Sequence, residues 1–180
     1  MDAIISSERI KVIRNIYLEE ETNVGYIDHL FHFLGNNTDI KINYLGIKNN
    51  YLGILLASTL ASTICKVRST QLDSSMKITL HQVETILQSI DLECRLNKLE
   101  LGYWKALSGV DLSPLLKVQD VKLKRGWHLR TLQKFCKTIA KSPESELKMK
   151  HLSLYFNNLS SLDPFHLASA CSNMRVLTSA

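Results

Sequence analysis

The chain has 180 residues, of which 45% are hydrophobic and 22% are charged, and its formal net charge at pH 7 is +5. These values exclude an intrinsically disordered chain, and the length is sufficient for one domain that buries roughly 70% of its unfolded surface. No segment has the pattern of a secretory signal or the length of a membrane-spanning helix, so we expect one cytoplasmic domain over residues 1–180.

A short apolar pattern recurs along the whole chain. The pattern is L-x-x-L-x-L, in which Ile, Val, Met or Thr replaces Leu at some positions. Copies begin at residues 13, 42, 67, 96, 118, 149 and 174, the last one incomplete, so they are separated by 22 to 31 residues. A period of about 20 to 29 residues is typical of repeats that each contribute a strand and a helix. The six complete triplets are Ile13/Ile16/Leu18, Ile42/Leu45/Ile47, Val67/Thr70/Leu72, Leu96/Leu99/Leu101, Val118/Val121/Leu123 and Met149/Leu152/Leu154.

The triplets predict strands, and the segments between them predict helices. Between triplets the apolar residues recur at spacings of three, four and seven, which indicates one apolar stripe along a helix. In chain order, the helical patterns lie at residues 30–34, 51–65, 80–90 and 129–140. The segment 104–116 contains Gly109 and Pro114, which leave room for only a short or irregular helix.

The repeat resembles the leucine-rich repeat superfamily, in the long-helix form of ribonuclease-inhibitor-like proteins and of the sensor ends of nucleotide-binding innate immune receptors. In that family an Asn or Cys caps the turn after the triplet, and Asn50 and Asn157 stand at this place in two units. The resemblance covers about residues 10–180. It implies an α/β fold, a right-handed β-α solenoid of six to seven repeats with a parallel sheet on the concave face and helices on the convex face.

The residues between the apolar positions of each triplet are expected on the concave face. They are polar, mixed in charge and partly aromatic, which suits a protein interface because aromatic anchors dominate interface energies. The alternative interpretation is that they are solvated strand residues with no binding role. The predicted binding residues are Tyr17, Glu19, Tyr44, Lys48, Gln71, Asp73, Lys98, Glu100, Lys122, Lys124, His151 and Tyr155.

Positive charge gathers in residues 117–150, which hold ten Lys or Arg against three acidic residues. A basic stripe recurs at spacings of three and four opposite the apolar side of the helix predicted over 129–140, and it suits an acidic protein, a nucleic acid or an anionic membrane. The alternative is a helix that merely shows its charged side to water. Nucleic acid is the less favoured partner because no nucleic-acid-binding motif accompanies the stripe. The stripe consists of Arg130, Lys134, Lys137 and Lys141.

The sequence predicts no enzyme activity, no cofactor and no metal. A Gly-rich phosphate loop, a G-x-S-x-G motif and an H-E-x-x-H motif are all absent. His29 and His32, beside Asp28, are a weak metal candidate because no third ligand is evident.

The four cysteines have no C-x-x-C spacing, so we expect small buried apolar residues. A disulfide in a secreted protein is the alternative. These cysteines are Cys65, Cys94, Cys136 and Cys171.

The leading functional hypothesis is a non-enzymatic module that recognises a protein partner through its concave sheet. The alternative is a structural, ligand-sensing or substrate-receptor segment of a larger assembly, such as an innate immune receptor or a ubiquitin ligase adaptor. Neither end of the repeat shows a polar capping unit, so we expect a fragment of a larger protein, ends covered by a partner, or self-association through the uncapped ends.

Overall fold

The computed structural model describes residues 12–19, 24–48, 56–72, 79–102, 109–124, 126–154, 163–173 and 176–178. Within these residues, strands and helices alternate along the chain. The strands are β1 (Val12–Leu18), β2 (Lys41–Ile47), β3 (Val67–Leu72), β4 (Lys98–Leu101), β5 (Asp120–Leu123), β6 (His151–Leu154) and β7 (Val176–Thr178). The helices are α2 (Val24–Asn36), α3 (Leu56–Ile64), α4 (Leu80–Gln88), α5 (Leu129–Lys141) and α6 (Pro164–Asn173), with 3-10 helices η1 (Ser113–Lys117) and η2 (Glu144–Glu146).

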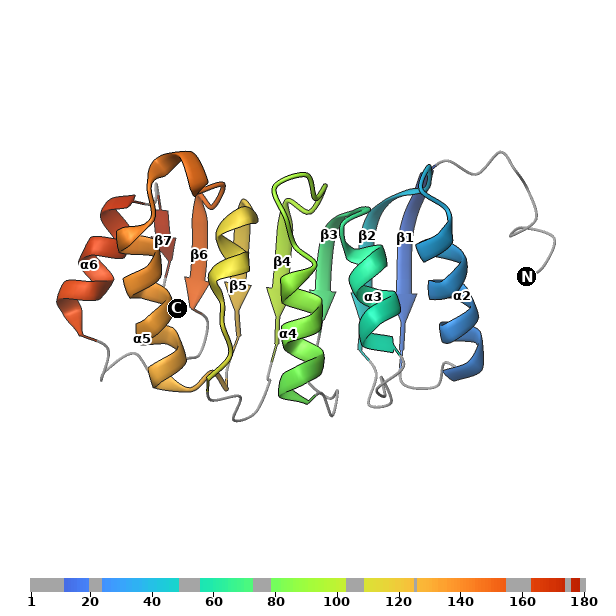
Figure 1. Cartoon of the computed structure of the whole chain (residues 1–180), viewed down its shortest axis with the longest axis horizontal. Helices are drawn as coiled ribbons and strands as arrows, with labels where there is room; N and C mark the ends of the chain where they lie inside the picture. Colours follow the sequence, from blue (N-terminus) through green and yellow to red (C-terminus); the bar gives the residue numbers. More distant parts are fainter. Residues whose placement is uncertain are drawn as a thin grey trace.

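The strands form one open parallel sheet whose spatial order is the order of the chain, from β1 to β7. The register places equivalent positions of successive triplets side by side, so that Ile13 lies beside Ile42 and Ile42 lies beside Val67. Figure 1 shows the helices gathered on one side of this sheet. The predicted α/β class, with a parallel sheet alternating with helices, is therefore confirmed.

The core lies between the sheet and the helices. In β4, β5 and β6 the two apolar positions are buried, whereas the residues between them are at least partly exposed. Helix α5 packs Leu132, Phe135, Cys136 and Ile139 into the same core, at the three- and four-residue spacings of one helix face. Burial of a large apolar side chain contributes about 1.5–3 kcal/mol relative to exposure, so the triplets and helix stripes stabilise the fold together.

Thr70 is the polar exception among the triplets. It takes the middle apolar position of the third triplet and lies between Leu45 and Leu99 in the sheet. Its side chain is buried, and Oγ1 has no hydrogen-bond partner. The core therefore contains an unsatisfied hydroxyl at a position that the other complete triplets fill with Ile, Leu or Val.

The segment between β4 and β5 departs from the regular strand-helix alternation. Its described part holds the five-residue 3-10 helix η1, with Pro114 in the first turn. Gly109 has a φ of +96°, a backbone conformation that favours glycine. The prediction of a short or irregular helix in residues 104–116 is confirmed for the described residues from 109 onward.

A basic residue directly precedes the first apolar residue of five triplets: Lys41, Lys66, Arg95, Lys117 and Lys148. The Lys66 ammonium reaches back across the preceding unit to the carboxyl end of α2. It donates to the carbonyl oxygens of Leu34, Gly35 and Asn37 at 2.6, 2.8 and 3.1 Å. Lys117 and Lys148 donate in the same way to Ile90 and Cys94. These side chains satisfy carbonyl groups that a helix end or turn leaves without partners.

Candidate binding face of the sheet

The side of the sheet opposite the helices presents the residues that lie between the apolar positions. The register aligns them in rows across neighbouring strands, which lie about 4.8 Å apart. One row is Asn15, Tyr44, Ser69, Lys98, Asp120 and His151, and the next is Tyr17, Gly46, Gln71, Glu100, Lys122 and Ser153. We call these two rows, with Glu19, Lys48 and Lys124 at the strand ends, the open face. No helix of the described ranges covers it, and in Figure 1 it lies behind the strands.

An aromatic pair lies at the β1 end of the open face. The ring centroids of Tyr17 and Tyr44 are 5.1 Å apart and the ring planes are tilted by 43°. Gly46 lies under both rings, since a Cβ there would be 3.0 Å from Tyr44 Cε1 and 3.1 Å from Tyr17 Cδ1. The glycine therefore gives the two rings room to lie against the sheet, and 63% of Tyr17 still remains exposed to solvent.

Tyr44 connects the aromatic pair to the polar centre of the open face. Its hydroxyl donates a hydrogen bond to Gln71 Oε1 at 3.0 Å. Burial is the main cause that raises the pKa of the Tyr44 hydroxyl above its ordinary value of 10.0. Tyr17 and Glu100 raise this pKa further, whereas the positive charge of Lys124 lowers it. Tyr44 is therefore held as a neutral phenol among interacting side chains.

Paired charges occupy the β4, β5 and β6 part of the open face. The Glu100 carboxylate is 13% exposed; Lys124 contacts its Oε1, and Lys122 Nζ lies 3.8 Å from its Oε2. Asp120 contacts Nδ1 of His151 on the neighbouring strand. Ion pairs that are open to solvent, such as Asp120–His151, contribute only about 0–1 kcal/mol. The less exposed pairs of Glu100 fix the position of its carboxylate.

The structure places ten of the twelve predicted binding residues together on the open face. Asp73 and Tyr155 lie outside the described residues, as do the predicted capping residues Asn50 and Asn157. Gly46 is a further residue of functional interest. It lies two residues after Tyr44 in β2 and beside Tyr17 of β1, and a glycine inside a strand is a signal for close packing of neighbouring groups. The ten residues are Tyr17, Glu19, Tyr44, Lys48, Gln71, Lys98, Glu100, Lys122, Lys124 and His151.

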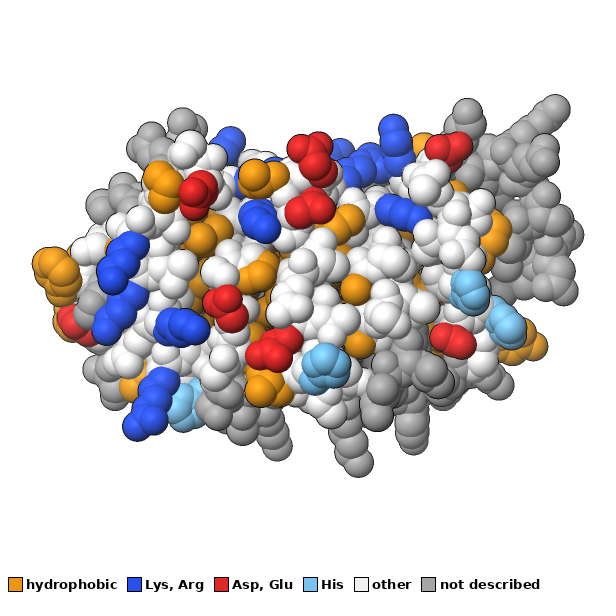
Figure 2. Space-filling model, viewed as in Figure 1, with side chains coloured by type: hydrophobic (Ala, Val, Ile, Leu, Met, Phe, Trp, Pro, Cys, Tyr) orange, Lys and Arg blue, Asp and Glu red, His pale blue; other side chains and the backbone are white. Residues whose placement is uncertain are grey.

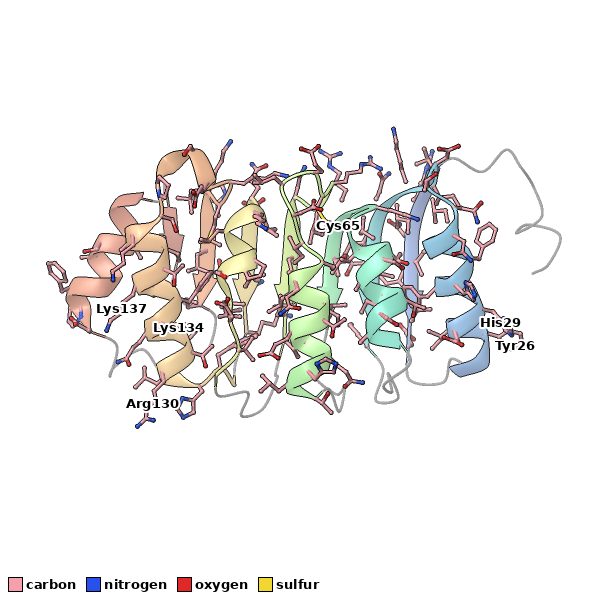
Figure 3. The ribbon with its side chains drawn as sticks, in the orientation of Figure 1. Tyr26, His29, Cys65, Arg130, Lys134 and Lys137 are labelled. Atoms are coloured by element: carbon pink, nitrogen blue, oxygen red, sulfur yellow. A yellow bond between two sulfur atoms is a disulfide. The ribbon has the colours of Figure 1, made fainter. Side chains whose placement is uncertain are left out.

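The basic stripe lies on the other side of the sheet. Figure 2 shows Lys and Arg side chains over α5 on the helix-covered side, and Figure 3 shows Arg130, Lys134 and Lys137 along this helix. These three residues and Lys141 are all exposed, opposite the buried residues of α5. The structure therefore does not bring the two predicted binding surfaces together.

The expectation of four unlinked, buried cysteines is wrong for two of them. Cys65 and Cys94 form a disulfide, with Cα atoms 4.4 Å apart, and Cys65 is only half-buried. Cys136 is a buried thiol on α5, and the side chain of Cys171 lies outside the described residues.

A signal for the disulfide was present in the sequence. Cys65 and Cys94 are separated by 29 residues, which is also the separation of Val67 and Leu96, the first apolar residues of successive triplets. Equivalent positions of neighbouring units are adjacent in the sheet, so the repeat itself brings the two sulfurs together.

The predicted histidine pair does not form a cluster of ligands. His29 and His32 are both exposed on α2, and His32 Nδ1 lies 2.8 Å from Asn36 Nδ2. Among the described residues, the sulfur and carboxylate atoms that do converge belong to Cys65, Asp91 and Cys94.

No helix of the described ranges has both the length and the apolar character needed to cross a bilayer. Comparison of the chain with protein-family models, with curated proteins and with solved structures found no match.

Proposed function

We propose that this chain is a non-enzymatic recognition module, a leucine-rich-repeat solenoid that binds a protein partner through the open face. The observation that carries the proposal is the register of the sheet. Equivalent polar and aromatic positions of successive units stand side by side, on the surface that the described helices leave uncovered. Stacked repeats with a shared core characteristically bind partners through such an extended surface.

The aromatic pair is the proposed anchor of the interface. Tyr17 offers a large exposed surface. The neighbouring ring of Tyr44 is held in place by its own hydrogen bond to Gln71. Truncation of an aromatic anchor of an interface typically costs about 2 kcal/mol or more of binding free energy. A ring already packed on a sheet loses little conformational entropy on binding, which favours affinity.

The paired charges are proposed to provide specificity. Glu100 with its two lysines, and Asp120 with His151, hold polar and charged groups in fixed positions on β4, β5 and β6. A partner with complementary charges at this spacing is preferred, because a juxtaposed like charge costs several kcal/mol.

Affinity capture tests the proposal directly. Full-length chain and the double variant Tyr17→Ala/Tyr44→Ala are used to capture proteins from lysate, with Tyr26→Ala as matched control because Tyr26 is a 68% exposed tyrosine on α2. We expect a partner that wild type and Tyr26→Ala retain and the double variant loses. Titration of that purified partner should then show Kd raised at least about 30-fold in the double variant. If the double variant is folded by circular dichroism and keeps every partner, the open face is the wrong surface.

A second candidate is binding of a polyanion by the basic stripe, which the exposure of all four side chains favours. Binding of RNA and duplex DNA is measured against salt concentration for wild type and for Lys134→Gln/Lys137→Gln. If the stripe contacts phosphates, a plot of the logarithm of the binding constant against the logarithm of salt concentration has a slope of about −0.7 to −0.9 per contact. The variant makes fewer contacts, so its slope should be shallower. No binding at low salt, or a slope near zero, would exclude this candidate.

The same open face would serve the chain as a ligand-sensing or substrate-receptor segment of a larger assembly.

Light scattering over a range of concentrations tests the predicted self-association through the ends. A rise in mass with concentration would support it, and a constant monomer mass would contradict it.

A further inference from the structure

The Cys65–Cys94 pair lies at the end of the sheet where the strands begin, away from the open-face tyrosines. Cys65 is in the turn between α3 and β3, and Cys94 is in the segment between α4 and β4. Figure 3 shows Cys65 at this upper end of the sheet. Each cysteine precedes the first apolar residue of its triplet by two positions. The pair therefore joins two successive units at equivalent points.

A third potential ligand converges on the two sulfurs. The Cys65 and Cys94 sulfurs and a carboxylate oxygen of Asp91 all lie within 4.8 Å of one another. The backbone N–H of Cys94 donates to Asp91 Oδ1 at 2.8 Å, which fixes the position of the carboxylate. The carbonyl oxygen of Ser89 lies 3.0 Å from the Cys65 sulfur, so the cluster is also bordered by a backbone oxygen. Second-shell hydrogen bonds of this kind orient metal ligands.

The burial of the three side chains is graded. Asp91 is exposed, Cys65 is half-buried and Cys94 is buried. An ion could therefore enter from solvent on the Asp91 side and meet the buried sulfur last. An entry path is a requirement for a binding site that exchanges its ion.

We propose that the reduced form of this cluster is a binding site for a thiophilic divalent cation, Zn²⁺ above all, held by the Cys65 and Cys94 thiolates and the Asp91 carboxylate. Three protein ligands and one water complete a tetrahedral zinc site. Zinc–sulfur bonds of about 2.3 Å place two thiolate sulfurs about 3.8 Å apart, so the two sulfurs, which are bonded here, must separate after reduction to hold the ion.

The chemistry balances with a thiol such as glutathione as reductant. Two molecules of the thiol transfer two electrons to the Cys65–Cys94 bond and leave as their own disulfide, and the two cysteines gain one proton each. Binding of one Zn²⁺ then releases these two protons. The two units are linked in either state, by the sulfur–sulfur bond under oxidising conditions and by the metal under reducing ones.

The experiment uses the full chain, reduced and freed of reductant without air, and Co²⁺ as a spectroscopic probe. Tetrahedral thiolate ligation gives Co²⁺ intense charge-transfer absorption. We expect one Co²⁺ per reduced chain, displaced by Zn²⁺, and none in the oxidised chain. Cys94→Ser should abolish the charge-transfer absorption, and Asp91→Asn should weaken Co²⁺ binding at least about tenfold.

Cys136→Ser is the matched control, because Cys136 is a buried thiol distant in sequence from the cluster. This variant should bind Co²⁺ like the wild type. The proposal is overturned by a reduced wild type without charge-transfer absorption, by absorption that persists in Cys94→Ser, or by unchanged affinity in Asp91→Asn. Circular dichroism verifies folding, and Cys65→Ser replaces Cys94→Ser in the test if the latter unfolds.

Discussion

Thr70 stands in a row of buried apolar side chains, and its hydroxyl has no partner there. An unsatisfied buried polar group costs about 1–3 kcal/mol. We therefore predict that Thr70→Val, which keeps the shape and removes the hydroxyl, raises the free energy of unfolding by about 1 kcal/mol in urea titrations.

Thr63→Val is the control for this prediction. Thr63 is also buried, but its hydroxyl donates to the Thr59 carbonyl at 2.9 Å, so its replacement should give no gain. A loss of stability in Thr70→Val would show that the hydroxyl has a partner in solution.

Tyr44 predicts a pH dependence of stability. Its pKa is raised in the folded chain, first by burial, so the unfolded chain releases the phenolic proton at lower pH than the folded chain does. Its contribution is thus complete below the ordinary value of 10.0 and is lost as pH rises through the folded pKa. The difference in unfolding free energy between wild type and Tyr44→Phe should therefore shrink as pH rises above about 10.

Wild type and Tyr44→Phe share every other titratable group, so the difference between their unfolding free energies removes the titration of those groups. Burial lowers the pKa of Lys66, so its contribution has the opposite sign and rises with pH, but it is present in both proteins. If the stability of wild type relative to Tyr44→Phe instead grows as pH rises above about 10, the raised pKa of Tyr44 is contradicted.

At the scale of elements, Lys66 joins the start of β3 to the end of α2. Its ammonium meets three carbonyl groups at the end of this helix, where a positive charge also complements the helix dipole. We predict that Lys66→Met, which retains the aliphatic stem, lowers the free energy of unfolding by about 1 kcal/mol. Lys41→Met is the matched control at the equivalent position of the preceding unit, and it should change stability by less than about 0.5 kcal/mol. Equal losses in both variants would exclude a capping role for Lys66.

The elements themselves were predictable because strand and helix differ in apolar period. The triplets gave the strands, and the three- and four-residue spacings gave α2, α3, α4 and α5. Gly109 and Pro114 correctly indicated the irregular fourth unit, which holds η1. A periodic pattern identifies such elements because each must bury one face.

The side-chain contacts were harder to predict because they depend on neighbours that are distant in the chain. The rows of the open face followed from the triplets, but the tyrosine pair over Gly46 depends on ring packing. The spacing of the cysteines relative to one another left a disulfide only as the alternative. The Cys65–Cys94 pairing follows instead from the position of both cysteines two residues before the first apolar residue of successive triplets. Since the repeat step varies from 22 to 31 residues, only alignment on the triplets reveals which residues are adjacent.

At the scale of the whole molecule, contacts run between successive elements. Helix α2 packs on α3, α3 on α4, and α5 on α6, while each strand pairs with the next in the chain. Such an arrangement makes stability a sum of local and nearest-neighbour contributions. Damage at one end should therefore remain largely at that end.

Phe31→Ala tests this locality. Phe31 is fully buried on α2, so its truncation should cost about 3–5 kcal/mol. We predict that amides of β1, β2 and β3 lose protection from hydrogen exchange, while amides of β5 and β6 keep most of their protection. A uniform loss across the sheet would mean that the chain unfolds as one cooperative unit.

The parallel stacking in chain order also means that the open face is divided into strands that can be added or removed one at a time. Inserting or deleting one whole unit would lengthen or shorten the surface by a single strand spacing, about 4.8 Å, without reversing any other column. A partner that spans the full width would sense this change as a shift in distance between the Tyr17 ring and the His151 imidazole, at the two flanks of the surface. The width of the open face can thus change in discrete steps while the side chains that each remaining strand presents stay the same.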